Sequence, residues 1–484
     1  MKNTKSPINS FPINLFKKVA PIIVHPLNIL IQNSFQSGTF PDQLKIAKIT
    51  PLHKSGDISD PANFRPISSL PYISKIYEKL MTKRILSYCK KFSVISSNQF
   101  GFQPGVSTCD ALVKLTESIY QSLNEKNHHT IALIDIKKAF DSVNHRKLLL
   151  KLESYGIRGL ALSWLKSYLK NRKCFMAIDD IKSDVLTFNV GVPQGSVLGP
   201  ILFLLYVNDL PNISHNLQTV LFADDTTIST SHSDYNELVQ LTNNALKNVS
   251  EWTNSNQLTL NSDKTELMII SMKQINENLN FEFNNDVITP TNTCRFLGVM
   301  LDNKLSFKSH IDLVMNKISR HSGILYKVKY CLPLATRISY YFAFIYPYLS
   351  YNVIVWGGTY KSHLNPLIIS HKKIIRNICD AEYLEHSSPL YKKLKLLKFE
   401  DIYKYNLLVY MFKARRSGLY FVEHERITRN RDQAYPNFHR LELTQHAVSF
   451  VGPKTWNLLP AYLRNIQKLG QFKCSLKKYL IDSY

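Results

Sequence analysis

The sequence predicts an α+β fold that is followed by a mainly helical region. Up to about residue 300, segments with helical spacing of apolar residues alternate with short β-prone runs, and from about residue 305 the pattern is helical almost to the end. The chain has 484 residues, of which 44% are hydrophobic, so several folded units are expected rather than one. Alternating helices and strands followed by helices alone are typical of an α+β part with an α part attached.

The first 125 residues are predicted to contain three helical segments and one clear strand. We expect a proline-interrupted helical segment over 11–45, a strand over 46–52 and an extended segment that resumes at 65–67 after a polar, turn-rich loop. Residues 72–92 and 108–124 have apolar side chains at helical spacing.

The middle of the chain predicts the strands of a central sheet. A β-prone run, 131–134, ends at Asp135, and two more runs flank Asp224 and Asp225. Between them, residues 145–172 are predicted to be helical and basic. The later elements are expected to be a helix over 234–252, a strand over 266–271 and further strands between 279 and 301.

The charge balance predicts a polyanionic partner. Lys and Arg total 60 against 36 Asp and Glu, which gives a formal net charge of +24. Such an excess is typical of a surface that lies along a phosphate backbone, with a basic protein that has no particular partner as the alternative. Half of the excess, +12, lies in residues 361–484 and predicts a separate basic surface, although solvated helix faces would have a similar composition.

Cysteine usage and hydropathy predict an intracellular protein without a membrane partner. None of the seven cysteines is at C-x-x-C spacing, so neither a disulfide framework nor a zinc finger is indicated. Residues 338–360 carry no charge and are long enough to span a bilayer. However, Pro347, six tyrosines and scattered polar residues favour packing between domains.

Carboxylates at strand ends form the candidate catalytic site. Asp135 ends one predicted strand, where we expect the chain to turn into a helix, and Asp224-Asp225 lies 89 residues further on at the tip between two β-prone runs. Two strands that bring carboxylates to one place make a site for paired divalent cations, which catalyse in-line attack on a phosphate. Asp179-Asp180 also lies between apolar runs and is interpreted as an ordinary exposed turn, so an Asp-Asp dipeptide alone is weak evidence for a catalytic site. With the net charge of +24, the combination predicts a nucleic-acid polymerase.

A glycine-rich loop strengthens this prediction. Three of the 16 glycines fall within nine residues, at 191, 195 and 199. Glycines allow a base or ribose to approach the backbone closely, and Gln194 and Ser196 would supply hydrogen bonds on either side of Gly195. A plain loop before the apolar helix 201–207 is the alternative.

In this order and spacing, the motifs resemble those of reverse transcriptases, in particular the non-LTR (LINE-like) retrotransposon branch and its jockey-type elements. The resemblance rests on Phe222-Ala223-Asp224-Asp225, on 191–200 with Ile201-Leu202-Phe203, and on Asp135 with Ala139-Phe140-Asp141. Further similar segments extend it over nearly the whole chain: 40–41, 51–57, 63–68, 99–102, 256–258 with Asn261 and Lys264-Thr265, 296–298 with Asp302, 356–357 and 456–460.

The resemblance implies a right-hand polymerase with fingers, a palm built on an antiparallel sheet, and a helical thumb. The implied division is an N-terminal helical extension over 1–45, fingers and palm over 46–300, the thumb over 301–360 and a basic helical region over 361–484. It also implies an RNA-directed DNA polymerase that copies retrotransposon RNA by nucleotidyl transfer from a dNTP to a primer 3′-hydroxyl. The implied partners are an RNA template, a DNA primer or target DNA, and dNTPs, and the implied location is the nucleus and cytoplasm.

Residue by residue, the resemblance implies the following roles. Asp135, Asp224 and Asp225 would be the catalytic carboxylates and would hold two Mg²⁺ ions, with Mn²⁺ as a possible substitute and Asp225 in a more supportive part. One ion would activate the primer 3′-hydroxyl, and the other would hold the triphosphate. Lys54 and Arg65 would bind the triphosphate, Phe140 would exclude a 2′-hydroxyl, and Lys264 would be a possible general acid. The nucleotide would also contact Gln194, Gly195 and Ser196. Phe296, Leu297 and Gly298 would form the primer grip. In isolation the charged side chains would be interpreted as surface residues and Phe140 as core.

Two features depart from the family pattern. The family usually has Arg after Gln-Phe-Gly-Phe, whereas this chain has Gln103. Only 45 residues precede the first predicted strand, too few for the upstream endonuclease of such elements, so a polymerase module or a truncated product is expected.

Two alternatives stay open: an RNA-dependent RNA polymerase, which Phe140 argues against, and a decayed or repurposed element product that binds RNA without polymerase activity.

Overall fold

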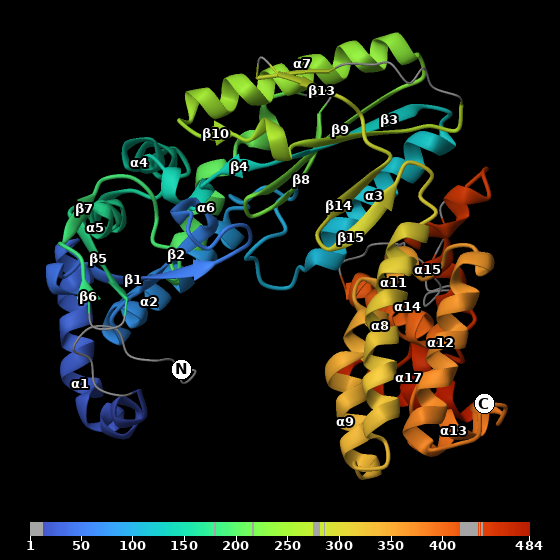
Figure 1. Ribbon diagram of the computed structural model, residues 1–484. Coiled ribbons are helices and arrows are strands. Elements are labelled where there is room, and N and C mark those ends of the chain that lie inside the picture. The colour runs from blue at the N-terminus through green and yellow to red at the C-terminus, as the bar shows by residue number, and fades with distance from the viewer. Residues whose placement is uncertain are drawn as a thin grey trace.

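The computed structural model describes residues 13–178, 181–214, 217–273, 281–284, 286–416, 434, 436 and 439–484. Figure 1 shows an arch: an N-terminal body on the left, a central sheet at the top, and a body of helices on the right. The expected turn at Asp179-Asp180 lies outside the described residues.

The central sheet has four antiparallel strands. Its order is β11-β3-β9-β8, with β3 at His128–Ile134, β8 at Gln218–Phe222, β9 at Asp225–His232 and β11 at Glu266–Ile270. Ile134 pairs with Thr226, so the next residues of β3 and β9 toward the strand ends are Asp135 and Asp225. The register of one strand pair therefore brings two of the predicted carboxylates side by side.

This sheet separates two apolar cores. Met268 and Ile270 of β11 pack in the core that contains α3 (Thr108–Asn124) and the helical body, whereas Leu267 and Ile269 pack in the other core. The alternation follows from the two-residue period of a strand. On the second side lies α7 (Tyr235–Ser255), above the sheet in Figure 1. Both faces of the sheet are thus covered, which leaves the ends of its strands accessible.

The N-terminal body contains a second, mixed sheet of order β2-β1-β5-β6, with β7 paired to β5. Strands β1 and β2 are antiparallel, whereas β1 and β5 are parallel. Its elements are α1 (Ile13–Ser37), β1 (Ile46–His53), β2 (Phe64–Ser69), α2 (Tyr72–Lys91), α4 (His145–Ser154), α5 (Gly159–Leu169), β5 (Arg172–Ile178), β6 (Ile181–Lys182), β7 (Leu186–Phe188) and α6 (Gly199–Val207).

Two predicted helical segments end earlier than expected. The segment predicted over 145–172 is two helices, α4 and α5, because Gly156 and Gly159 both take the left-handed backbone conformation (φ +87° and +59°). The segment predicted over 11–45 is helical only to Ser37, where Gly38 has φ +65° and ends α1. In both cases a glycine that can adopt positive φ ends the helix.

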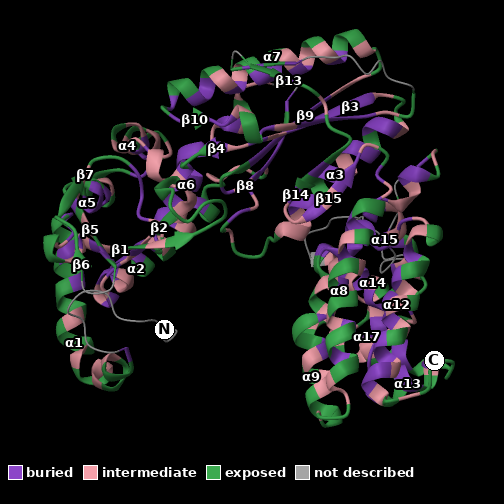
Figure 2. Ribbon diagram, in the orientation of Figure 1, coloured by how far each residue is buried: buried purple, intermediate pink, exposed green. Residues whose placement is uncertain are grey.

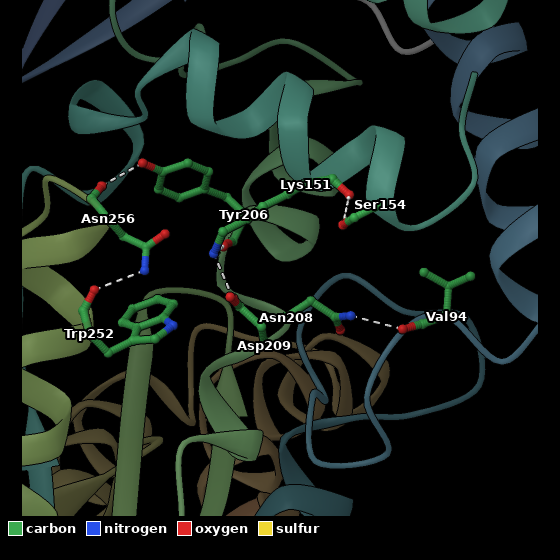
Figure 3. Close-up of polar contacts among 8 residues, drawn as sticks. All are labelled: Val94, Lys151, Ser154, Tyr206, Asn208, Asp209, Trp252 and Asn256. Atoms are coloured by element: carbon green, nitrogen blue, oxygen red, sulfur yellow. Dashed lines mark hydrogen bonds and ion pairs between the residues drawn. The ribbon is translucent and has the colours of Figure 1, made fainter. Parts of the chain in front are cut away.

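A lysine joins α4 to the centre of the molecule (Figure 3). Lys151 Nζ lies 2.6 Å from Asp209 Oδ1 and donates to the backbone oxygen of Tyr206 at 2.7 Å. The Tyr206 hydroxyl in turn donates to the backbone oxygen of Asn256, at the end of α7, at 2.5 Å. These contacts fix α4, α6 and α7 against one another behind the candidate site.

The helical body follows two short hairpins, which consist of β12 (Phe281–Phe283), β13 (Asp286–Ile288), β14 (Thr293–Phe296) and β15 (Val299–Asp302). Figure 2 shows buried residues concentrated between its helices, and Trp356 and Trp456 are fully buried there. Its helices are α8 (Lys308–Val328), α9 (Leu334–Phe344), α10 (Tyr346–Ser350), α11 (Val353–Trp356), α12 (Lys361–Cys379), α13 (Ser387–Leu394), α14 (Phe399–Arg416), α15 (Val448–Asn457), α16 (Ala461–Arg464) and α17 (Leu469–Asp482). Within the described part of the chain, no helix is both long and apolar enough to cross a membrane.

Candidate active site

The turn between β8 and β9 carries the Asp pair. Phe222 pairs with Asp225, so Ala223 and Asp224 form a two-residue hairpin turn. Ala223 has φ +60°, and a positive φ at this position is typical of the tight turns that match the twist of a hairpin. Asp224 and Asp225 are both exposed at this tip, whereas Ala223 is buried beneath it.

The buried side of this turn rests on the Gln-Phe-Gly segment. The Phe100 backbone nitrogen donates to the Leu221 oxygen at 2.8 Å, so the segment runs beside β8. The Gln99 side-chain oxygen accepts from the backbone nitrogens of Gly101 at 2.8 Å and Ala223 at 3.1 Å. A Cβ added at Gly101 would lie only 2.4 Å from the Ala223 nitrogen. Sequence reasoning matched this segment to the family but missed that it supports the turn that carries Asp224.

Gln103, where this chain departs from the family pattern, stabilises the same Gln-Phe-Gly segment. Its side-chain nitrogen donates a hydrogen bond to the backbone oxygen of Gln99. Phe102, between them, takes a left-handed conformation with φ +51° and is half exposed. The glutamine therefore folds back onto its own loop.

After Asp135 the chain does not enter an α-helix, contrary to the sequence prediction. Two residues, Ile136–Lys137, form β4 and pair with β10 (Thr259–Leu260). Lys138 then takes φ +47°, and a short 3-10 turn follows over Ala139–Ser142. Pairing with β10 continues the extended backbone past the acid, so the segment that follows Asp135 places no helix N-terminus beside its carboxylate.

The three carboxylates influence one another electrostatically. Surrounding protein atoms remove part of the hydration of the exposed Asp225 carboxyl and raise its pKa to about 6, and the charges of Asp224 and Asp135 add to the effect. The pKa of Asp224 is also raised, mainly by loss of hydration and further by Asp135, while Arg65 and Lys54 oppose the shift. The site thus concentrates negative charge close to the cationic side chains of Arg65 and Lys54.

The donor chemistry at this tip fits Mg²⁺, although the protein supplies only part of a ligand set. Carboxylate oxygens are the ligands that Mg²⁺ prefers, and the accumulated negative charge at Asp135, Asp224 and Asp225 favours a divalent cation. Across the described ranges, no three His, Cys, Asp or Glu side chains converge closely enough to hold one ion. Mg²⁺ is commonly held by one or two carboxylates together with water and substrate phosphates, so a partial set is compatible with the ion.

Lys54 and Arg65 belong to the β1–β2 hairpin. Arg65 pairs with Leu52 in its register, and the Lys54 backbone nitrogen donates to the Asn63 oxygen at 2.9 Å. Both cationic side chains are exposed, and both lower the pKa of Asp224. The fold therefore brings these two predicted residues within electrostatic reach of the Asp pair.

Phe140 is half-buried against α6. Its ring stacks on Phe203 with centroids 4.7 Å apart and planes at 28°. The Val192 backbone nitrogen donates to the Phe140 oxygen at 2.8 Å, and Gln194 donates through its amide to Asp141 Oδ2 at 2.8 Å. The glycine-rich loop and the Phe140 turn are thus held together beside the sheet edge.

The other members of the glycine-rich loop make structural contacts. Gly195 has φ +107°, and a Cβ there would lie 2.6 Å from the Ser68 oxygen of β2. Ser196 is 7% exposed; its hydroxyl donates to the Pro193 oxygen at 2.8 Å and accepts from the Gly199 nitrogen at 2.9 Å. Close packing explains these two residue types, and their nucleotide contacts stay a prediction.

The last predicted residues lie on two turns or, for Phe296, at the end of the strand before one of them. Lys264 is exposed, and its backbone nitrogen donates to the oxygen of Asn261 at 3.2 Å. Phe296 is buried, while Leu297 and Gly298 form the β14–β15 turn with φ +43° and +84°. The Tyr351 hydroxyl donates to the Leu297 oxygen at 2.8 Å, which ties this turn to the helical body.

An antiparallel sheet with acidic residues on a hairpin turn and at the end of the adjacent strand, flanked by two bodies, defines an α+β fold of the polymerase type. The family model "Reverse transcriptase (RNA-dependent DNA polymerase)" matches residues 52–301. This chain belongs to the reverse transcriptase family.

Relatives support the same assignment. The chain is 30% identical to the probable RNA-directed DNA polymerase from transposon X-element of Drosophila melanogaster, over 76% of this chain and 41% of that protein. It is 28% identical to the RNA-directed DNA polymerase from mobile element jockey of the same species, over 78% of this chain and 42% of that protein. The resemblance to non-LTR retrotransposon enzymes is thereby confirmed.

The chain spans less than half the length of these curated relatives. Among solved structures, it is similar to telomerase from Candida albicans in complex with a fragment of telomeric RNA, with a TM-score of 0.42, 12% identity and coverage of 82% of this chain and 73% of that chain.

Proposed function

We propose that the chain is an RNA-directed DNA polymerase, which adds nucleotides from dNTPs to the 3′-hydroxyl of a DNA primer along an RNA template. The observation that carries this proposal is the placement of Asp135 and Asp225 at adjacent strand ends, with Asp224 on the turn beside them. Retrotransposon RNA is the proposed template, and a nicked target DNA is a second source of primer. Family membership supports the reaction type.

The carboxylates are proposed to hold two Mg²⁺ ions, for which Mn²⁺ can substitute. Bound there, the ions lower the pKa of the primer hydroxyl and neutralise charge on the triphosphate. Asp135 and Asp224 supply the principal ligands, and Asp225 supports them. Lys54 and Arg65, exposed on the β1–β2 hairpin, bind the triphosphate, since a guanidinium suits bidentate contact with phosphate.

Other residues select and position the substrates. The Phe140 ring, fixed by stacking on Phe203, lies under the incoming sugar and offers no hydrogen bond to a 2′-hydroxyl. Lys264 protonates the departing pyrophosphate, and the turn at Leu297 and Gly298 positions the primer terminus. Gln194, Gly195 and Ser196 of the glycine-rich loop contact the nucleotide.

The domain division follows the same proposal. Residues 1–45 form an extension, 46–300 the fingers and palm, 301–360 the thumb, and 361–484 a basic region that contacts nucleic acid. The helices that begin at Lys308 and the excess of Lys and Arg after residue 360 support it. Nuclear and cytoplasmic location rests on the resemblance to the family.

The unmodified protein should incorporate dTTP on a poly(rA) template primed with oligo(dT), and only with a divalent cation present. Removing the cation with EDTA should stop incorporation, and adding Mg²⁺ back should restore it, because the carboxylates alone cannot activate the hydroxyl. Replacing dTTP with UTP separates DNA from RNA synthesis. Retained RNA binding without any incorporation would instead favour the non-catalytic alternative.

Phe140→Ala should lower the preference for dTTP over UTP by roughly 10- to 100-fold in kcat/KM, the scale of losing one close apolar contact. Removing the ring leaves room for the 2′-hydroxyl. Steady-state incorporation of the two nucleotides on the same template measures the ratio. Phe342→Ala, an exposed position on α9, is the matched control. A ratio unchanged in Phe140→Ala would remove this residue from the sugar site.

A further inference from the structure

We propose that Asn261 is a positioning residue that orients the Asp135 carboxylate for divalent-cation binding. The inference rests on the proposed function, because it takes Asp135 to be a metal ligand. It adds a residue to which no role has so far been given.

Asn261 holds Asp135 at two points. Its side-chain nitrogen donates to Asp135 Oδ2 at 2.8 Å, and its backbone nitrogen donates to the Asp135 carbonyl oxygen at 2.9 Å. The first contact fixes the rotation of the carboxylate plane and occupies one lone pair of Oδ2, so Oδ1 stays available to a cation. Hydrogen bonds from outside the ligand set orient metal-binding carboxylates in this way.

The position of Asn261 is itself tightly determined. The two residues before it pair with the two residues after Asp135, Leu260 with Ile136 and Thr259 with Lys137. The Asn261 oxygen accepts from the Thr265 hydroxyl at 2.9 Å and from the Thr265 nitrogen at 3.1 Å. Five residues upstream, the end of α7 is held by the Tyr206 hydroxyl on Asn256 (Figure 3). The amide therefore reaches Asp135 from a fixed backbone.

Local structure gives no other reason for an asparagine here. Asn261 has φ −118°, a conformation that any residue adopts, so a left-handed backbone does not require it. It precedes a 3-10 turn, yet its side chain makes no capping hydrogen bond to that turn. The residue is 8% exposed, and its side-chain nitrogen donates to the Asp135 carboxylate. The side-chain amide of Asn261 therefore bonds to the Asp135 carboxylate and does not cap the 3-10 turn.

Removing the amide should weaken cation binding while leaving the fold intact, since the backbone hydrogen bond from Asn261 to Asp135 is kept when alanine or histidine replaces the residue. Loss of such a supporting hydrogen bond typically costs roughly 10- to 100-fold in metal affinity. Asn261→Ala deletes the donor. Asn261→His keeps an N–H donor at a similar reach on its ring.

The test measures binding of Mn²⁺ alone to the full chain by calorimetry, without nucleotide or template. We expect about 10-fold weaker Mn²⁺ binding in Asn261→Ala and recovery to within about threefold in Asn261→His. Asp135→Asn defines the binding that depends on the site. The matched control is Asn457→Ala in the helical body, whose amide nitrogen and oxygen both bond to the Ala434 backbone far from the sheet edge in sequence. It should bind Mn²⁺ like the unmodified protein.

Equal Mn²⁺ affinity in Asn261→Ala and the unmodified protein would overturn the inference, and so would an equal loss in Asn457→Ala or an absence of Asp135-dependent binding. Measuring dTTP incorporation on the same preparations separates the two proposals. If the enzyme is active but its Mn²⁺ affinity does not depend on Asn261, only this inference is overturned. An inactive protein that binds Mn²⁺ through Asp135 and Asn261 overturns the polymerase function alone.

Discussion

Asp224→Asn is expected to reduce dTTP incorporation on poly(rA)/oligo(dT) by roughly 10³-fold, because removal of one group that stabilises transition-state charge costs about this much. Asparagine has nearly the shape of aspartate, and the side chain is exposed at a two-residue turn, so the hairpin should be retained. What is lost is the charge that, on the proposed mechanism, holds the cation beside the primer hydroxyl. Single-nucleotide extension under saturating primer measures the rate.

Asp312→Asn, an exposed position on α8, is the control for a charge change of equal size. It should extend the primer at the unmodified rate. If Asp224→Asn retained more than a tenth of the activity, the catalytic role of the turn would be wrong.

The same variant should gain thermal stability in EDTA at pH 7. The Asp224 charge helps to raise the pKa of Asp225 to about 6, above its ordinary value of 3.8. A raised pKa means that the folded state holds the proton more tightly than the unfolded chain, so stability falls as the pH rises from about 4 to 6. Neutralising Asp224 removes part of this penalty at neutral pH. A melting temperature in EDTA that is higher than that of the unmodified protein would show that activity is maintained at a cost in stability.

Sequence patterns predicted the elements whose cause is local. Residues 108–124 form α3 with the predicted bounds, because apolar spacing along the helix is combined with a capping box between Ser107 and Asp110 at its start. Strand β3 ends directly before Asp135, as its β-prone run indicated. The alternation of helices and strands likewise predicted the α+β class.

Contacts between distant residues could not be predicted in this way. Gln99 contacts Ala223 and Asn261 contacts Asp135 across more than 120 residues, and no local pattern encodes such a pairing. The density of glycine at 191–199 was interpreted as room for a nucleotide, yet Gly195 faces the Ser68 oxygen of β2. A sequence motif thus indicates that a residue type is required without saying whether a substrate or the protein itself requires it.

Gly101→Ala is expected to lower incorporation by roughly 100-fold, because a displacement of about 1 Å at a catalytic group has an effect of this size. The added Cβ would lie 2.4 Å from the Ala223 nitrogen, so backbone rather than a flexible side chain must move. Gly101 does not have a positive φ, so alanine is permitted by the backbone and the effect comes from the contact alone. The turn that carries Asp224 should therefore shift away from Asp135.

Gly323→Ala on α8 is the matched control, since no atom of the described residues lies within 4 Å of a Cβ added there. It should be fully active and slightly more stable, by up to about 1 kcal/mol, because alanine favours a helix over glycine. Gly101→Ala should instead lose roughly 1–3 kcal/mol of stability from the forced contact. Full activity in Gly101→Ala would mean that the hairpin can shift without loss of function. The Gln-Phe-Gly segment would then not set the position of the turn that carries Asp224.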